Sequence, residues 1–319
     1  MQAYDALHTL NQWLNRNIVG QEHLVQRMLI ALLADGHLLV EGAPGLAKTK
    51  AIKTLSDAIE GNFHRIQFTP DLLPADVTGT DIYRPEQGRF EFQPGPIFHN
   101  LVLSDEINRA PAKVQSALLE AMAERQVSVG STTYPLPELF MVMATQNPIE
   151  QEGTYPLPEA QLDRFLMQVL VDYPNLNAER QILKLARAEA AHQEAEPPTT
   201  VKQNVLFEAR NAVLDIHMAE AVEEYIVQLI NASRRPADYD ADLAQWLEYG
   251  ASPRATIALD RCARAHAWLE GRDYVSPDDV RAIAHDVLRH RLILTFEAEA
   301  TGVTGEQAID RLLDVVPLA

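Results

Sequence analysis

The octapeptide Gly-Ala-Pro-Gly-Leu-Ala-Lys-Thr at residues 42–49 constrains the fold of this chain more than any other segment. It follows an apolar run, His-Leu-Leu-Val-Glu-Gly, and precedes a stretch with helical spacing. In a strand–turn–helix unit of this kind, backbone N–H groups and the helix N-terminus converge on phosphate oxygens. The motif predicts that Lys48 reaches the β- and γ-phosphates of ATP and that the Thr49 hydroxyl binds Mg²⁺. The candidate phosphate-binding residues are Gly42, Ala43, Pro44, Gly45, Leu46, Ala47, Lys48 and Thr49.

One position departs from the general pattern of such loops. Ala47 stands before the lysine, where glycine is favoured because it lets the backbone approach closely and adopt a positive φ. An alanine there is either accommodated at modest strain or weakens phosphate binding. A plain Gly-Pro turn between a strand and a helix is the alternative to a phosphate loop, and the Lys-Thr pair with its flanks disfavours it.

Short apolar runs alternate with stretches of helical spacing up to about residue 173. Near-continuous apolar runs are typical of parallel strands that are buried on both faces. Residues 111–124 place Val114, Leu118 and Met122 on one face of a predicted helix. Segments 79–98 and 126–137 have the turn residues and alternation of hairpins. The alternation predicts an α/β fold with a parallel sheet. The predicted strands are 37–42, 62–68, 101–106, 140–147 and 165–171.

The pattern changes after Tyr173. A predicted helix at 177–190 leads into a polar, Pro-containing linker at 191–200, and everything beyond it has helical spacing. One of these later helices begins at Ser276, which is followed by proline and two acids, as is usual at a helix N-terminus. We therefore expect an α/β nucleotide-binding domain over residues 1–190 and a helical domain over residues 191–319.

Polar residues end two of the predicted strands. Asp105 and Glu106 follow an apolar run, and a buried strand would deliver them to the carboxyl edge of the sheet, where open α/β sheets bind ligands. We expect Asp105 to bind Mg²⁺, through water, and Glu106 to orient and deprotonate the attacking water. The neutral amide of Asn147 can contact both the γ-phosphate and that water; a simple Asn-Pro turn is the alternative.

Charge and composition limit the kinds of partner. The chain carries 27 Lys and Arg against 45 Asp and Glu, a formal charge of −18, and such a surface repels phosphate backbones and anionic lipid. Its first residues lack the basic segment and apolar run of a signal peptide, and no apolar run reaches the roughly 20 residues that span a bilayer. Cys262 is the only cysteine, which fits a reducing compartment, with a cysteine-poor exported protein as the alternative. We expect a cytoplasmic protein, with no nucleic-acid partner and no membrane insertion.

Together these segments resemble an AAA+ ATPase: residues 42–49 resemble its Walker A loop, 101–106 its Walker B strand and 144–148 its sensor-1 strand. The form with alanine before the lysine is similar to that of the MoxR family, and further matching text lies at 104–127, 144–165 and 250–280. The resemblance extends from about Asn17 onward. It implies a five-stranded parallel sheet, a helical lid, and two hairpin insertions, in helix 2 and before sensor 1. It also implies that Ile18 and Val19 line the adenine pocket.

The resemblance also implies an oligomer. Arg164, in Leu-Asp-Arg-Phe, resembles an arginine finger that would complete a neighbour's site, and Arg254, in Ala-Ser-Pro-Arg, resembles a sensor-2 residue on the lid and close to the nucleotide. Without the family context, a surface salt bridge and a helix-packing role are the simpler interpretations of these two residues. Relatives of this kind imply a hexameric ring that remodels client proteins, with a partner carrying a von Willebrand factor A domain.

Three other functions stay open on the sequence. A nucleic-acid motor of the same clade would use similar hairpins, but segment 126–137 has no Lys or Arg, and segment 79–98 sets Arg84 and Arg89 against three acids. A metal-chelatase subunit also resembles this clade. A scaffold that binds ATP without turnover is disfavoured, because candidate catalytic residues are present at each expected position.

Overall fold

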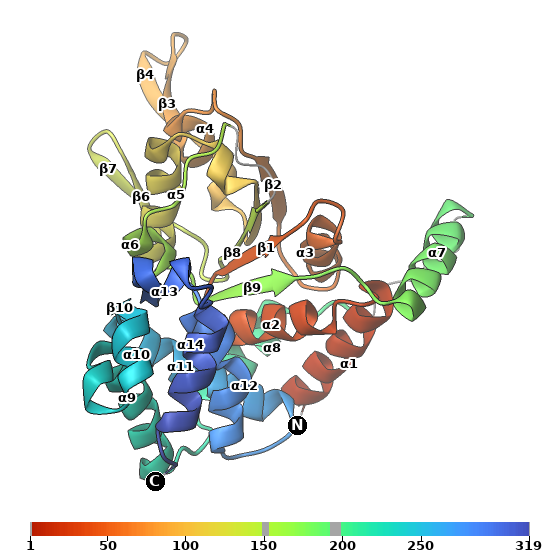
Figure 1. Ribbon diagram of the computed structural model, residues 1–319. Coiled ribbons are helices and arrows are strands. Elements are labelled where there is room, and N and C mark those ends of the chain that lie inside the picture. Colours follow the sequence, from red (N-terminus) through yellow and green to blue (C-terminus); the bar gives the residue numbers. More distant parts are fainter. Residues whose placement is uncertain (1, 149–152, 192–198, 319) are drawn as a thin grey trace.

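The computed structural model describes residues 2–148, 153–191 and 199–318, and it has a five-stranded parallel sheet at its centre (Figure 1). The strand order is β2-β5-β8-β1-β9, and every neighbouring pair is parallel. All five predicted strands are confirmed, each slightly shorter than expected, and so is the α/β class. The strands are β1 (Leu38–Gly42), β2 (Phe63–Gln67), β5 (Leu101–Asp105), β8 (Met141–Gln146) and β9 (Met167–Val171).

Both faces of the sheet are covered by helices. Alternate residues of the central strands accordingly pack into two different cores. Leu101 and Leu103 of β5 join a core with α1 (Gln2–Asn17), α2 (Glu22–Leu33) and α3 (Lys48–Asp57). Val102 between them joins a second core with α5 (Ala112–Glu124). Because both faces of these strands are buried, successive residues are apolar, and this explains the continuous apolar runs of the sequence. Helix α5 confirms the helix predicted over 111–124.

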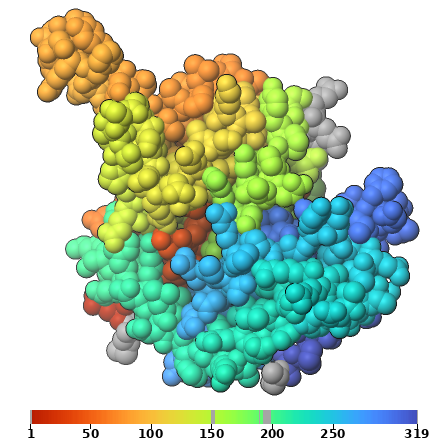
Figure 2. All heavy atoms as spheres, turned by 90° about the vertical axis from the view of Figure 1, so that its left-hand side faces the viewer, coloured from red at the N-terminus to blue at the C-terminus, as the bar shows by residue number. Residues whose placement is uncertain are grey.

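Both predicted hairpins are present. One pairs β3 (Gly79–Arg84) with β4 (Arg89–Pro94), and the other pairs β6 (Gln126–Val129) with β7 (Thr132–Pro135). Figure 2 shows the first hairpin projecting from the body of the molecule, above the second. The rings of Phe92 and Tyr134 stack with centroids 3.9 Å apart, so the two hairpins touch. The short elements nearby are α4 (Pro74–Thr78), η1 (Pro96–Phe98), η2 (Ile107–Arg109) and α6 (Glu159–Leu162).

The C-terminal part is mainly helical and rests on the first two helices. Helix α8 contacts α1 and α2, and α11 contacts α2, α9 and α12. The expectation that this part is wholly helical is wrong in one place, where β10 and β11 form a short antiparallel ladder. The bounds are α8 (Gln203–Leu214), α9 (Glu220–Arg234), η3 (Pro236–Asp238), α10 (Ala241–Trp246), β10 (Leu247–Tyr249), α11 (Pro253–Leu269), α12 (Pro277–Leu288), β11 (Ile293–Leu294), α13 (Phe296–Ala300) and α14 (Gly305–Val315).

Two features of the connection between these parts bear on the predictions. Helix α7 (Leu176–Ala190) is present as predicted and extends away from the sheet (Figure 1), whereas most of the predicted linker lies outside the described residues. The division of the chain at residue 190 stays a prediction. No helix in the described part of the chain is both long and apolar enough to cross a bilayer.

Candidate active site

The predicted phosphate loop connects β1 to α3, as its sequence context requires. Gly42 is needed for strand packing, since a Cβ there would lie 2.6 Å from the carbonyl oxygen of Val171 on β9. Gly45 has a φ of +83°. The loop forms one wall of a pocket of about 360 Å³, which Pro44 through Thr49 line together with Asp105, Glu106 and Asn147. The structure therefore brings the predicted loop, acids and amide to one place.

Lys48 is buried and ties the loop to the end of a neighbouring strand. Its ammonium donates to the carbonyl oxygens of Gly42 at 2.6 Å and Gln146 at 3.3 Å. Burial lowers the pKa of Lys48, and the carboxylates of Asp105 and Glu106 oppose that shift. Backbone carbonyls and nearby acids thus hold a cation at the mouth of the loop, where an incoming phosphate would meet it.

Ala47 adopts the strained backbone conformation that its position suggested. It is the N-cap of α3, with φ 58° and ψ 12°, in the left-handed region. A side chain in this region costs roughly 1–2 kcal/mol relative to the right-handed conformation, a cost that glycine does not carry. The loop therefore accommodates alanine with local strain, and the effect of alanine on phosphate binding stays a prediction.

Replacing Ala47 with glycine should therefore stabilise the protein. The relief of strain exceeds the roughly 0.4–1 kcal/mol that a glycine loses through the entropy of the unfolded chain, so we expect a gain of about 0.5–1 kcal/mol. Urea unfolding would measure it. Ala117→Gly, in the right-handed interior of α5, is the matched control and should lose about 1 kcal/mol. Equal losses in both variants would contradict the strain at Ala47.

The two acids at the carboxyl end of β5 are held by residues from both neighbouring strands. The Thr145 hydroxyl on β8 donates to Asp105 Oδ1 at 2.6 Å and accepts the Glu106 N–H at 2.9 Å. Arg65 on β2 contacts Asp105 Oδ2 at 2.7 Å. Gln67, also on β2, donates to Glu106 Oε2 at 3.0 Å. The sequence interpretation missed Thr145, Arg65 and Gln67.

The backbone conformation of Glu106, as well as its contacts, orients its carboxylate. Its φ of 57° places it in the left-handed region, a conformation that non-glycine residues adopt at a cost and that often marks a functional position. Arg109 Nε lies 3.1 Å from its Oε2. Asn147, at the end of β8, is buried and lines the same pocket. An acid and an amide thus face the pocket that the phosphate loop forms.

The oxygen donors at this pocket fit a magnesium ion that arrives with a nucleotide. No group of three or more His, Cys, Asp or Glu side chains suited to a metal occurs among the described residues. Asp105 and Thr49 line the same pocket and offer a carboxylate and a hydroxyl. Mg²⁺ is commonly bound by one or two such oxygens, with phosphates and water completing its shell.

A second pocket, of about 280 Å³, adjoins the first and shares Pro44 through Ala47 with it. Ile18 and Val19, predicted for the adenine pocket, line it together with Tyr173 and Ile182 of α7. Ile18 is buried, with an exposed fraction of 1%. An apolar pocket directly beside a phosphate loop suits a nucleobase.

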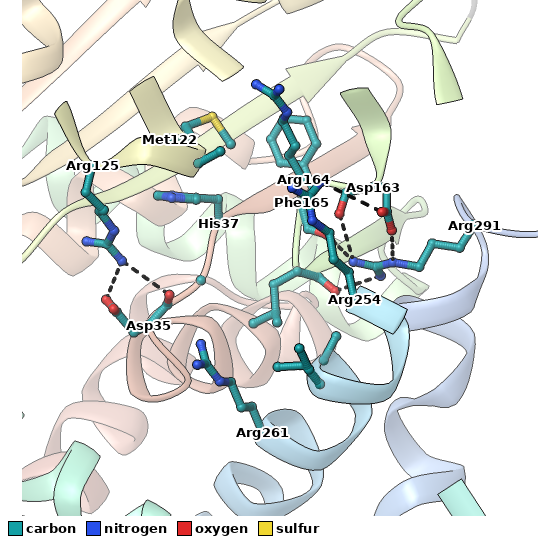
Figure 3. Close-up of a pocket in the computed structure, with 15 residues that line it drawn as sticks. Asp35, His37, Met122, Arg125, Asp163, Arg164, Phe165, Arg254, Arg261 and Arg291 are labelled. Atoms are coloured by element: carbon teal, nitrogen blue, oxygen red, sulfur yellow. Dashed lines mark hydrogen bonds and ion pairs between the residues drawn. The ribbon is translucent and has the colours of Figure 1, made fainter. Parts of the chain in front are cut away.

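Arg164 and Arg254 lie elsewhere, in a third pocket of about 300 Å³ (Figure 3). It opens at the amino ends of β1 and β9, across the sheet from the phosphate loop, and shares no lining residue with the phosphate-loop pocket. Arg254 was expected on the lid and close to the nucleotide; it lies on α11 with Nη1 3.8 Å from Asp163 Oδ2. The Arg164 guanidinium forms no ion pair within the described ranges.

The third pocket is strongly cationic. Asp163 is engaged by Arg291 at 2.8 Å and by the Ser252 hydroxyl at 2.8 Å, and Asp35 is engaged by Arg125 at 2.7 Å. Its two acids are therefore neutralised, which leaves an excess of positive charge suited to an anionic group. The arginines that line it are Arg125, Arg164, Arg254, Arg261 and Arg291.

Comparisons with known proteins agree with this geometry. Residues 37–167 match the ATPase family associated with various cellular activities (AAA), and residues 241–312 match the AAA lid domain. The chain is 47% identical to Chaperone MoxR1 of Mycobacterium tuberculosis, over 98% of this chain and 83% of that protein. It is 36% identical to Protein MoxR of Paracoccus denitrificans, over 88% and 87%. A putative ATPase from Cytophaga hutchinsonii has a similar structure, with a TM-score of 0.92, 45% identity, and coverage of 100% and 96%. With its phosphate loop, paired acids and helical lid, this chain is an ATPase and belongs to the MoxR family of AAA+ proteins.

Proposed function

We propose that this ATPase assembles into a hexameric ring, hydrolyses Mg²⁺·ATP between neighbouring subunits, and uses the cycle for chaperone-like remodelling or maturation of partner proteins. The observation that carries the proposal is the position of Arg164 and Arg254. They line a pocket at the opposite edge of the sheet from the phosphate loop of the same chain. A strand of five residues is roughly 17 Å long. These arginines can therefore reach only the nucleotide of another subunit.

Within one site, the roles follow from the contacts. The phosphate loop and Lys48 bind the β- and γ-phosphates, and Asp105 and Thr49 are the candidate ligands of the metal. When bound, magnesium neutralises charge on the phosphates. Glu106 takes the proton of the attacking water, and Asn147 orients that water against the γ-phosphate. Arg164 from the adjacent subunit stabilises the charge that develops on the transferred group, and Arg254 contacts the same phosphates from the adjacent lid.

The chaperone part of the proposal rests on the relatives and on the two hairpins. Mycobacterium tuberculosis MoxR1 is named a chaperone. The hairpins touch through Phe92 and Tyr134, so a movement of either would pass to the other. We propose client proteins and a partner with a von Willebrand factor A domain, with metal insertion as one form of maturation. We place this activity in the cytoplasm, which suits a chain with a single, buried thiol at Cys262.

A nucleic-acid motor and a chelatase subunit are the alternatives. Arg84 of the projecting hairpin is paired with Glu91 at 3.1 Å, and the β6–β7 hairpin carries no Lys or Arg, so neither offers a cationic track for phosphates. A salt-sensitive mobility shift of single-stranded DNA on addition of the protein would favour the motor. Partner-dependent insertion of a metal into a tetrapyrrole would favour the chelatase.

The proposed function can be tested with a variant that binds ATP but does not hydrolyse it. With Mg²⁺·ATP, Glu106→Gln should sediment as a hexamer and retain client proteins on a tagged column. Lys48→Ala is the control. Because this chain cannot hold the triphosphate, it should neither form the hexamer nor retain client proteins. A Glu106→Gln chain that stays monomeric at micromolar concentration with saturating Mg²⁺·ATP would contradict the ring, and with it the assignment of Arg164 to a neighbour's site.

A further inference from the structure

Arg65 holds the oxygen of Asp105 that a magnesium ion would approach. Its Nε and Nη2 both donate to Asp105 Oδ2, at 3.1 and 2.7 Å. The other oxygen, Oδ1, accepts the Thr145 hydroxyl at 2.6 Å. Thr145 is a buried neighbour on β8 that also holds the Glu106 N–H, so Oδ1 is committed to organising the two acids. Oδ2 has no contact with Thr145 and faces the guanidinium instead, so a metal that used this oxygen would compete with Arg65.

This ion pair has little to do with the stability of the fold. The Arg65 side chain is 49% exposed, and ion pairs with a half-exposed partner contribute little. Both nitrogens contact one oxygen, so the pair lacks the two parallel bonds of a bidentate arginine–carboxylate contact. The strand register explains the contact instead: Gln67 of β2 pairs with Asp105 of β5, which places Arg65 on the same face, two residues earlier.

The same side chain lines the phosphate-loop pocket. Arg65 contributes to its wall together with Lys48, Lys50 and Thr49. A magnesium ion held at Asp105, directly or through one of its waters, would compete with the guanidinium for Oδ2, and the two cations would repel each other. The displaced group is then beside the triphosphate, with anionic oxygens within reach of a long, flexible side chain. Because a guanidinium suits phosphate oxygens, the γ-phosphate is its natural new partner.

We propose that Arg65 makes the site selective for ATP over ADP, by pairing with Asp105 until magnesium takes Oδ2 and then pairing with the γ-phosphate. With ATP, the lost ion pair is replaced by a new one. With ADP, the γ-phosphate is missing, so displacement of Arg65 is not compensated. The proposal rests on the nucleotide site described above and adds to it a residue that senses the third phosphate.

Binding measurements on the full chain test this without relying on turnover. Affinities for ATP and ADP would be measured by calorimetry across a magnesium titration, with unchanged protein, Arg65→Gln, Arg65→Lys and Arg84→Gln. In Arg65→Gln, the preference for ATP over ADP should fall roughly tenfold, the usual worth of a charge-assisted hydrogen bond. The magnesium concentration for half-maximal ADP binding should also fall, because its competitor at Oδ2 is gone.

Two further variants define the outcome. Arg65→Lys keeps the positive charge but lacks the paired N–H donors of the guanidinium. Its preference for ATP over ADP should therefore lie between those of the unchanged protein and Arg65→Gln. Arg84→Gln removes an arginine of similar exposure, 50%, from its pair with Glu91 on the projecting hairpin, and should behave as the unchanged protein. Thermal unfolding of each variant would confirm that it is folded.

The proposal is overturned if Arg65→Gln keeps the ATP preference within twofold of the unchanged protein, if its magnesium midpoint with ADP does not fall, or if Arg65→Lys loses as much as Arg65→Gln. These failures leave the proposed function standing, since the unchanged protein would still bind Mg²⁺·ATP. If the unchanged protein itself binds no Mg²⁺·ATP, the nucleotide site and the role of Arg65 fall together.

Discussion

Replacing Glu106 with glutamine should lower ATP hydrolysis about 10²–10⁴-fold, the usual contribution of a general base, while ATP binding changes little. The amide cannot accept the proton of the attacking water, yet it has nearly the shape of the carboxylate. It can still occupy the place that Gln67 and Arg109 define around Oε2, at 3.0 and 3.1 Å. Phosphate release would measure turnover, and titration with a fluorescent ATP analogue would measure affinity.

Glu120→Gln, an exposed position on α5, is the matched control and should hydrolyse ATP at the unchanged rate. The Lys48→Ala chain should behave in the opposite way and lose binding, because the phosphates would lose the ammonium beside the loop. Undiminished hydrolysis by Glu106→Gln would require another base. Loss of binding equal to that of Lys48→Ala would mean that Glu106 supports the pocket and not the chemistry.

The central fold follows from the sequence because burial on both faces leaves a strong signal. Strands β5 and β8 lie between two cores and are almost wholly buried, and the apolar runs at their starts allowed their bounds to be predicted within a residue or two. The turn residues around Gly88 and Gly130, both with positive φ, marked the two hairpins. The β10–β11 ladder was missed because strands of three and two residues are too short to show alternation.

The site was predictable only as far as single segments determine it. Asp105, Glu106 and Lys48 follow from local motifs, since each stands at the end of a strand or the start of a helix. Arg65 and Thr145 belong to β2 and β8, which flank β5 in the sheet. Nothing local in the sequence states that order, so their contacts with the acids were out of reach. The relevant signal was Arg65 itself, a charged residue within a predicted strand.

The position of Arg254 depends on packing between distant segments. Its helix, α11, begins beside Asp163, which accepts the Ser252 hydroxyl and pairs with Arg291 after α12. These contacts fix the start of α11 at the amino ends of the strands. A sequence motif can identify such an arginine, but only the packing of α11 against α2 and α12 determines which edge of the sheet it faces.

Arg164→Ala should reduce the ATPase rate of the assembled protein roughly 10³–10⁵-fold, the range known for arginine fingers that act across an interface. The Arg164 guanidinium forms no ion pair with a residue that the structure describes, so its removal leaves no buried charge behind. ATP affinity should change far less than the rate, because the side chain acts on charge that develops during transfer. Phosphate release at saturating ATP, with assembly checked by sedimentation, would measure the effect.

Mixing variants shows whether the arginine acts on a neighbour. Arg164→Ala subunits retain an intact phosphate loop and acids, and Glu106→Gln subunits retain an intact Arg164. In a mixed ring, some interfaces join these two intact halves, so hydrolysis should reappear although each variant alone is inactive. Mixtures of Glu106→Gln with Lys48→Ala are the matched control, because no interface in such a ring has an intact site. If subunits exchange but hydrolysis does not recover in the mixture of Arg164→Ala with Glu106→Gln, Arg164 does not act in the neighbour's site. The cationic pocket would then need another anionic ligand, because a guanidinium at the amino edge of the sheet is too far from its own phosphate loop to act there.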